Sequence, residues 1–434
     1  MLAIRIVGIT FAVILTSFFF FPFEFTILPG INTKMALAGV GLLVLGYQLA
    51  SHRTGLINKQ VFLLSIWAGI ASIIGCFSIT FNNTPDTAYA TYIVSMWVWL
   101  SAAYTVTTYI RMVHGNLSTM LLLRYLIIVC VCQCILALLI DSYPNIKQII
   151  DQYVQQGQEF LNKTNVNRLY GIGASLDVAG SRFAALLVMI AFSVTDMCKT
   201  DERKYIPLFL VAFFLIAVIG NMIARTTTIG LILAVSYWMY MSGVLTFKID
   251  TNYSTLWSWF LWILAATIVI AVFCYHFVPG TEEKLRFAFE GFFSLVEKGE
   301  WSVSSNDRLK GMYVFPETLK TWLIGDGYFS NPRNIDPYFI GKEIGGYYMG
   351  TDVGYLRFIF YFGLGGLFAM CMVIYKAGNF CMNNLSRYRD MFLLLLLVNY
   401  VVWFKVSTDI FLVFALFLMV NRSEEEDKQL QHEI

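Results

Sequence analysis

The sequence predicts an all-α, polytopic membrane protein with about 12 transmembrane helices and a large loop domain on the outer side. Hydrophobic residues make up 58% of the 434 positions and charged residues only 13%, about half the charged share of a soluble domain. The apolar residues also come in runs close to the roughly 20 residues that cross a bilayer core about 30 Å thick. The net charge of +2 is close to zero and gives no reason to expect nucleic acid as a partner.

Twelve apolar runs follow one another along the chain, and each is expected to form one span. The first run follows Arg5 and ends without a small-residue cleavage site, so we expect an uncleaved helix rather than a signal peptide. The last two runs are short and are expected to form a hairpin around Lys405. A single long helix is the alternative, and it would move the C-terminus to the other side. The runs lie at about 4–23, 35–50, 61–80, 90–110, 120–140, 182–197, 205–223, 227–246, 257–279, 352–375, 391–404 and 407–421.

Lysine and arginine residues predict the orientation of the spans, because they accumulate in cytoplasmic loops. Alternate short loops are rich in them, whereas the loops between carry only Lys34, Arg225 and Lys405. Both termini, including the acidic tail 424–427, are therefore expected in the cytoplasm, and two long loops face outward. The basic loops contain Arg53, Lys59, Arg111, Arg124, Lys199, Arg203, Lys204, Lys248, Lys376, Arg387 and Arg389.

This orientation divides the chain into five parts. Residues 1–140 hold helices 1–5, and residues 141–181 form a first outer loop. Residues 182–279 hold helices 6–9, and residues 280–351 form the large outer loop. Residues 352–434 hold helices 10–12 and a cytoplasmic tail.

Helices are also predicted within the two outer loops. Residues 146–154 place apolar side chains on one helical face and polar ones on the other, which is typical of a helix lying on the outer leaflet. In the large loop, one apolar stripe runs at helical spacing from Leu285 to Val296. Pro316 suits the first turn of a further helix, which ends before Gly325.

Five arginines are expected on the outer side: Arg168, Arg182, Arg225 and Arg357 beside or within predicted spans, and Arg308 within the large loop. Arginine stays charged and grips phosphate with two parallel N–H donors, so several converging arginines would bind a diphosphate. The alternative is that each one reaches lipid phosphate or pairs with a nearby carboxylate. Arg357 lies deepest in a span and is expected to face the protein interior, because facing lipid would be costly.

Asp352 is the carboxylate best placed for chemistry, because it ends the large outer loop where the tenth span begins. It is a candidate base pointing into a cavity beneath the loop, or else the N-cap of the following helix. Glu317 and Asp307 are weaker candidates, since loop carboxylates are usually solvated. Lys405 and Asp409 are four residues apart and are expected to pair with each other.

Other chemistries are not indicated by the sequence. The eight cysteines and four histidines are scattered and form no Cys-x-x-Cys pair, so we expect neither disulfides nor a metal site. The sequence has no P-loop, so no nucleotide cofactor is expected. Most predicted spans carry no ionisable residue at mid-depth, which argues against an ion-coupled pump.

A pattern of four segments covers residues about 165–370. In this order the segments resemble the bacterial Wzy-type O-antigen and capsule polysaccharide polymerases, and more distantly the O-antigen ligases. Ala224 stands where the family commonly has serine. Ligases usually carry a histidine near the position of Asp352, whereas the outer-side histidine here is His276, and this favours a polymerase. The segments are Arg168-Leu169-Tyr170-Gly171; Arg225-Thr226-Thr227; Arg308 with Leu319, Leu323 and Gly325-Asp326-Gly327-Tyr328; and Thr351-Asp352-Val353-Gly354-Tyr355-Leu356 with Gly363-Leu364-Gly365-Gly366.

The resemblance implies a GT-C-like fold and a glycosyltransferase of the bacterial inner (cytoplasmic) membrane. Such an enzyme joins oligosaccharide repeats carried on undecaprenyl diphosphate, at the outer face, without a metal or other cofactor. The resemblance also implies membrane lipid, a chain-length regulator and a flippase as partners. It assigns the leaving diphosphate to Arg168, Arg225 and Arg308, the base to Asp352, and substrate binding to Arg182, Arg357, Tyr170 and Tyr355.

Three other functions stay open. A ligase would move finished polymer onto another acceptor with the same fold and leaving group. A lipid-linked sugar flippase or transporter would show inverted repeats and polar residues in mid-span. A non-enzymatic assembly partner would not depend on the outer arginines.

Overall fold

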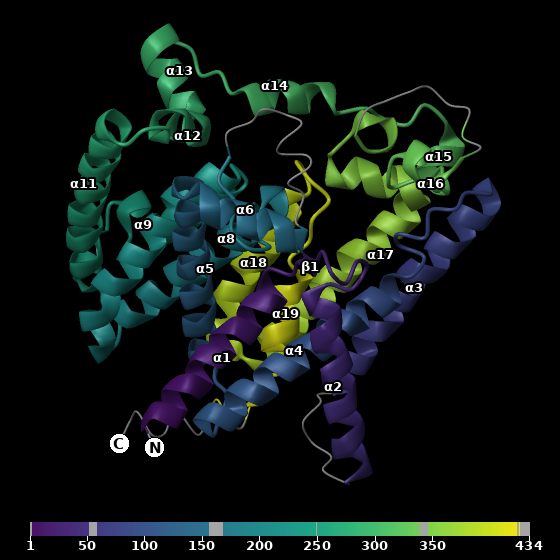
Figure 1. Ribbon diagram of the computed structural model, residues 1–434, viewed down its shortest axis with the longest axis horizontal. Helices are drawn as coiled ribbons and strands as arrows, with labels where there is room; N and C mark the ends of the chain where they lie inside the picture. The colour runs from purple at the N-terminus through teal and green to yellow at the C-terminus, as the bar shows by residue number, and fades with distance from the viewer. Residues whose placement is uncertain are drawn as a thin grey trace.

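The computed structural model describes residues 2–51, 59–155, 168–248, 250–337, 339, 346–422 and 425, and these residues are almost entirely helical (Figure 1). Each of the twelve predicted apolar runs overlaps one of its helices. These helices are α1 (Leu2–Phe20), α2 (Thr33–Ala50), α3 (Lys59–Asn82), α4 (Tyr92–His114), α5 (Thr119–Ser142), α8 (Leu176–Cys198), α9 (Ile206–Ile223), α10 (Thr227–Met241), α11 (Ser254–Phe277), α17 (Gly354–Asn384), α18 (Arg389–Val402) and α19 (Phe411–Phe417).

Eight helices of the described chain are long and apolar enough to cross a membrane. They are α1, α3, α4, α5, α8, α9, α11 and α17. This result confirms the predicted all-α class and supports a multi-pass membrane protein. The other four helices, α2, α10, α18 and α19, fall outside this set, so the count of twelve spans stays a prediction.

Helix α8 is the most enclosed of the eight, with α5, α9, α10 and α18 packed around it. Its crossing with α10 is close because Gly230 has no side chain: a Cβ atom there would lie 2.3 Å from the backbone of Ala184. Small residues at a helix crossing let two backbones approach and gain van der Waals contact. Helix α8 therefore fixes the segment that leads into it and the turn between α9 and α10.

The last two apolar runs form two helices that fold back on each other. Tyr388, just before α18, donates a hydrogen bond of 2.8 Å to Glu425, which follows α19. Glu425 also accepts hydrogen bonds from the backbone N–H and the hydroxyl of Thr119 at the start of α5, at 2.8 and 3.1 Å. The predicted hairpin is confirmed, and the alternative of one long helix is wrong. The rest of the acidic tail, apart from Glu425, lies outside the described residues.

The short helices of the large loop gather at one end of the molecule, and α1 begins at the opposite end (Figure 1). We call the end that carries α12 to α16 the outer end. The tip of the hairpin, residues 403–410, lies at the outer end too, since Lys405 contacts the start of α8 there. The separation agrees with the predicted topology, while the orientation across the membrane stays a prediction.

The amphipathic helix predicted at 146–154 is present as α6 (Pro144–Tyr153). None of its residues is buried, and the apolar Ile149 and Tyr153 are exposed. An antiparallel pair of two-residue strands, β1 (Glu24–Phe25) and β2 (Val154–Gln155), joins the end of this helix to the turn after α1. The helix is confirmed, and its contact with the outer leaflet stays a prediction.

The single apolar stripe predicted from Leu285 to Val296 is wrong, because the helix breaks at Phe289. Helix α12 (Thr281–Ala288) ends before this residue and α13 (Glu290–Lys298) starts after it. Leu285 is buried in α12, whereas Phe292 and Val296 of α13 are 59% and 85% exposed. The break turns the second half of the stripe away from the helical body.

The prediction of a helix with Pro316 in its first turn is also wrong, although its C-terminal boundary is confirmed. Helix α15 (Leu319–Leu323) starts three residues later, where the Thr318 side chain caps it by accepting from the backbone N–H of Thr321. Pro316 instead offers its carbonyl to the indole N–H of Trp322 at 3.0 Å. The other loop helices are α14 (Ser304–Gly311) and α16 (Pro332–Ile335).

Helix α17 is kinked at Phe362 and Gly363, where the turn after α15 packs against it. Gly363 has φ +69°, and a Cβ atom there would lie 2.3 Å from the carbonyl oxygen of Leu323. The backbone N–H of Asp326 donates to the carbonyl of Phe360 at 2.6 Å. Glycine is therefore required at the kink, both for the left-handed backbone and for the close approach. This contact holds the end of the large loop on the start of α17.

Candidate functional site

Two of the predicted site arginines share one aromatic ring at the outer end. Arg168 lies in the segment before α8, and Arg225 lies in the turn between α9 and α10. Their guanidinium carbons lie 4.8 and 4.2 Å from the centre of the Phe287 ring on α12. A cation over an aromatic face is attracted by the electrons of the ring. Phe287 thus brings together two arginines that are far apart in the sequence.

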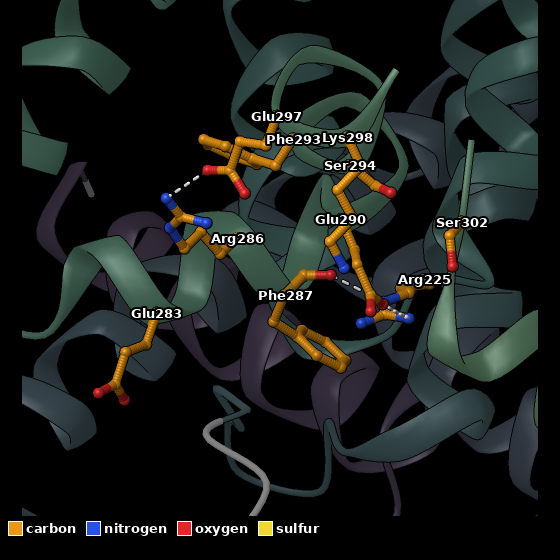
Figure 2. A pocket seen from close by; sticks show the side chains of 10 residues that line it. All are labelled: Arg225, Glu283, Arg286, Phe287, Glu290, Phe293, Ser294, Glu297, Lys298 and Ser302. Carbon is orange, nitrogen blue, oxygen red and sulfur yellow. Dashed lines mark hydrogen bonds and ion pairs between the residues drawn. The ribbon is translucent and has the colours of Figure 1, made fainter. Parts of the chain in front are cut away.

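Arg225 is fully engaged with the large loop (Figure 2). Its Nε donates to the carbonyl oxygen of Phe287 at 2.7 Å, and its Nη1 donates to the hydroxyl of Ser305 at 3.0 Å. Nη1 also lies 2.7 Å from Oε2 of Glu290, and these two side chains are 13% and 32% exposed. Arg225 therefore holds the breaks between α12, α13 and α14 against the turn between α9 and α10.

A groove with a volume of about 350 Å³ opens beside Arg225 (Figure 2). The pair Arg225–Glu290 lies at one end of the groove, and a second ion pair, Arg286–Glu297 at 2.6 Å, lies at the other. Arg286 also forms an ion pair with Glu282 on its own helix. The ion pairs of Arg286 are thus separate from the pair of Arg225 with Glu290. The groove is lined by Arg225, Glu283, Arg286, Phe287, Glu290, Phe293, Ser294, Glu297, Lys298 and Ser302.

Arg168 differs from Arg225 in having a donor that is not used. Its Nε atom is buried and has no hydrogen-bond partner among the described residues. Burial lowers the pKa of Arg168, Asp177 opposes this effect, and the positive charges of Arg225 and Arg308 lower the pKa further. Arg308 on α14 is exposed. The positive charges of Arg225 and Arg308 thus both act on Arg168, and we call these three residues the cation group.

Asp352 does not cap the helix that follows it, so the N-cap alternative is wrong. Helix α17 has Val353 at its N-cap and no capping side chain. Burial raises the pKa of the Asp352 carboxyl, and the neighbouring Asp177 adds to the increase, while Arg357 and other cations oppose it. A carboxyl whose pKa is raised binds a proton more strongly than a free carboxyl does, which favours the role of a general base.

The sequence analysis missed a three-residue contact beside these groups. Lys405 at the hairpin tip donates to Asp177 in the first turn of α8 at 2.9 Å and to the hydroxyl of Thr226 at 2.8 Å. The Thr226 hydroxyl in turn donates to Asp177. The prediction that Lys405 pairs with Asp409 is wrong, because Asp409 instead accepts from the backbone N–H of Phe411 at 3.0 Å. The acidic residue just before a span, Asp177, was the signal that could have found this contact.

Arg357 is confirmed as an inward-facing residue, and both of its Nη atoms donate to the protein. It is 5% exposed and lies between two aromatic rings, 3.6 Å from the centre of Phe329 and 3.4 Å from that of Tyr347. Its Nη1 donates to the hydroxyl of Ser407 at 2.6 Å and its Nη2 to the carbonyl of Phe329 at 3.0 Å. Arg357 therefore ties the large loop to the hairpin tip.

The other three predicted binding residues contact different parts of the chain. Arg182 is 4% exposed in α8, within 6 Å of the rings of Phe21 and Trp99. Tyr170 donates to Asp151 of α6 at 2.8 Å. Tyr355 donates to the carbonyl of Tyr400 on α18 at 3.0 Å. The structure groups Arg168, Arg225 and Arg308, and it leaves Arg182, Tyr170 and Tyr355 in contacts that hold the fold.

The fold is that of a multi-pass helical protein, and the cation group lies at its outer end. Among the described residues, no cluster of three or more metal-binding side chains occurs. Comparison of the chain with protein-family models, with curated proteins and with solved structures found no match.

Proposed function

We propose that this protein polymerises oligosaccharide repeat units carried on undecaprenyl diphosphate into O-antigen or capsular polysaccharide. The reaction takes place at the outer face of the bacterial inner membrane and needs no metal. The observation that carries the proposal is the grouping of Arg168, Arg225 and Arg308 around the loop that contains Phe287. Several arginines that lie close together suit a ligand with two phosphates.

In the proposed reaction, a sugar hydroxyl of one repeat attacks the anomeric carbon that carries the diphosphate of another. The new glycosidic bond forms as the bond between carbon and diphosphate oxygen breaks, and the hydroxyl proton passes to Asp352. Negative charge grows on the departing lipid diphosphate, so fixed cations at that position lower the barrier. Arg168 and Arg308 supply these cations directly, and Arg225 supplies another when it is released from Glu290.

The test is substitution of the cation group in cells, with polysaccharide length read on a gel. We expect Arg168→Ala and Arg225→Ala each to lower polymerisation by about 10²- to 10³-fold, the usual loss when one preorganised donor is removed. Lysine at either position should also impair polymerisation, because it cannot form the two-pronged contact. Arg286→Ala is the matched control, since Arg286 lies on the same loop but pairs with Glu297. Normal long chains from both alanine variants, at normal expression, would refute the proposal.

The product separates the alternatives with the same variants. Loss of polymer length indicates a polymerase, whereas loss of attachment of full-length polymer to its final acceptor indicates a ligase. A flippase would lose the transfer of single repeat units across the membrane. Normal products after removal of all three arginines would indicate an assembly partner that is not an enzyme.

A further inference from the structure

Glu290 occupies the position at Arg225 that an incoming phosphate oxygen would need. Its Oε2 atom lies 2.7 Å from Nη1 of Arg225 and accepts a second hydrogen bond, of 2.9 Å, from the hydroxyl of Ser304. A guanidinium and a hydroxyl that converge on one anionic oxygen are equally suited to a carboxylate and to a phosphate. The arrangement is therefore an anion site that is already filled by a residue of the chain.

Helix α13, which carries Glu290 as its first residue, is attached to the protein through few buried side chains. The chain breaks from helical geometry at Phe289, and α13 ends at Gly299, which has φ +73°. Within the helix only Gly291 and Ser294 are buried. Movement of α13 away from Arg225 would therefore expose little apolar surface that is now covered.

We infer that Glu290 is a built-in competitor for the Arg225 anion site, and that a phosphate ligand binds there by exchange with it. The inference rests on the proposed function and adds a mechanism of selection to it. A ligand must displace one carboxylate, so only an anion with several contacts binds well. Arg168 lies over the same Phe287 ring as Arg225, so the second phosphate of a diphosphate would add the attraction of Arg168, whereas the single phosphate of an ordinary lipid headgroup would not. Glu290 thus keeps the site free of the phosphate that surrounds it in a membrane.

The experiment measures binding of inorganic pyrophosphate and of inorganic phosphate to the purified full-length protein, by calorimetry in a non-ionic detergent without divalent cations. We expect Glu290→Gln to tighten binding of both anions about tenfold, because the glutamine keeps the size of the side chain but removes its charge. Glu297→Gln is the matched control, because it removes the same charge from the same helix at the pair with Arg286. We expect it to change either affinity by less than twofold.

Two results would overturn the inference: unchanged or weaker binding in Glu290→Gln, or an equal gain in Glu297→Gln. The double variant Arg225→Ala/Glu290→Gln should lose the gain, which ties the effect to Arg225 and not to general charge. Arg225→Ala alone separates this inference from the proposed function. If it leaves pyrophosphate binding intact, the anion site itself is wrong. If it weakens binding while Glu290→Gln has no effect, only the exchange is wrong.

Discussion

The contact between Lys405 and Asp177 gives the sharpest test of the structure, because the sequence favours a different partner. Lys405 and Asp409 are four residues apart, yet the structure places Lys405 2.9 Å from Asp177. The two paired side chains are 25% and 30% exposed, so the strength of their interaction should lie between that of an exposed ion pair and that of a buried one. Exposed pairs contribute about 0–1 kcal/mol, and breaking a buried pair costs about 3–5 kcal/mol. We expect a coupling free energy of about 1–3 kcal/mol.

Two double-mutant cycles measure this coupling in the apparent free energy of unfolding, obtained by denaturant titration in detergent. The first cycle combines Lys405→Met with Asp177→Asn, and the second combines Lys405→Met with Asp409→Asn. The second coupling should stay below about 0.5 kcal/mol, the scatter expected for residues that share no contact. A coupling to Asp409 that equals or exceeds the coupling to Asp177 would refute the arrangement of the hairpin tip.

Two further predictions concern the core and the candidate base. Gly230→Ala should destabilise the protein by about 3 kcal/mol, the upper end for overpacking, because its Cβ would lie 2.3 Å from the α8 backbone. Gly39→Ala has open space around its Cβ and should stabilise by about 0.5–1 kcal/mol, as expected for glycine in a helix interior; thermal unfolding of both variants checks this, and equal effects would contradict it. Asp352→Asn should abolish long polymer but raise stability at neutral pH. The fold raises the pKa of Asp352 through burial, so the folded state keeps its proton to a higher pH than the unfolded chain and loses stability as that carboxyl ionises. The gain from asparagine in the free energy of unfolding should increase as the pH rises through the raised pKa of Asp352, and a gain that does not change with pH would contradict the assignment.

The helices could be predicted well because lipid imposes a simple requirement on the chain. A run of apolar residues must satisfy its backbone internally, and a helix does this without any distant partner. All twelve runs overlap helices for this reason. The large loop has no such constraint. The apolar stripe predicted from Leu285 to Val296 is interrupted at Phe289, next to the contacts that Arg225 makes with the chain. The position of that break depends on a residue more than sixty positions earlier in the sequence.

The candidate site was predictable as a set of residues but not as an arrangement. Expected position on the outer side singled out Arg168, Arg225 and Arg308; the structure places Arg168 and Arg225 over one ring, and the charge of Arg308 acts on Arg168. The same criterion also selected Arg182, whose surroundings are the core of α8. Asp177 escaped notice because its partner Lys405 lies 228 residues away. The rule for residues four apart describes neighbours on one helix. Helix α18 ends at Val402, before Lys405, so the rule does not apply to Lys405 and Asp409.

The structure gives Arg357 and the grouped arginines different physical roles. A phosphate could reach Arg357 only by displacing Phe329 and Tyr347 from both faces of its guanidinium, and it would also break the bond to Ser407. Arg357 therefore fixes the loop and the hairpin tip on either side of Asp352, and its charge opposes the rise in the pKa of that carboxyl. Arg168 lies over the ring of Phe287 at 4.8 Å, and the charges of Arg225 and Arg308 act on it. The surroundings of the two arginines therefore differ: Arg357 lies between two aromatic rings and bonds Ser407, whereas Arg168 lies over one ring that it shares with Arg225.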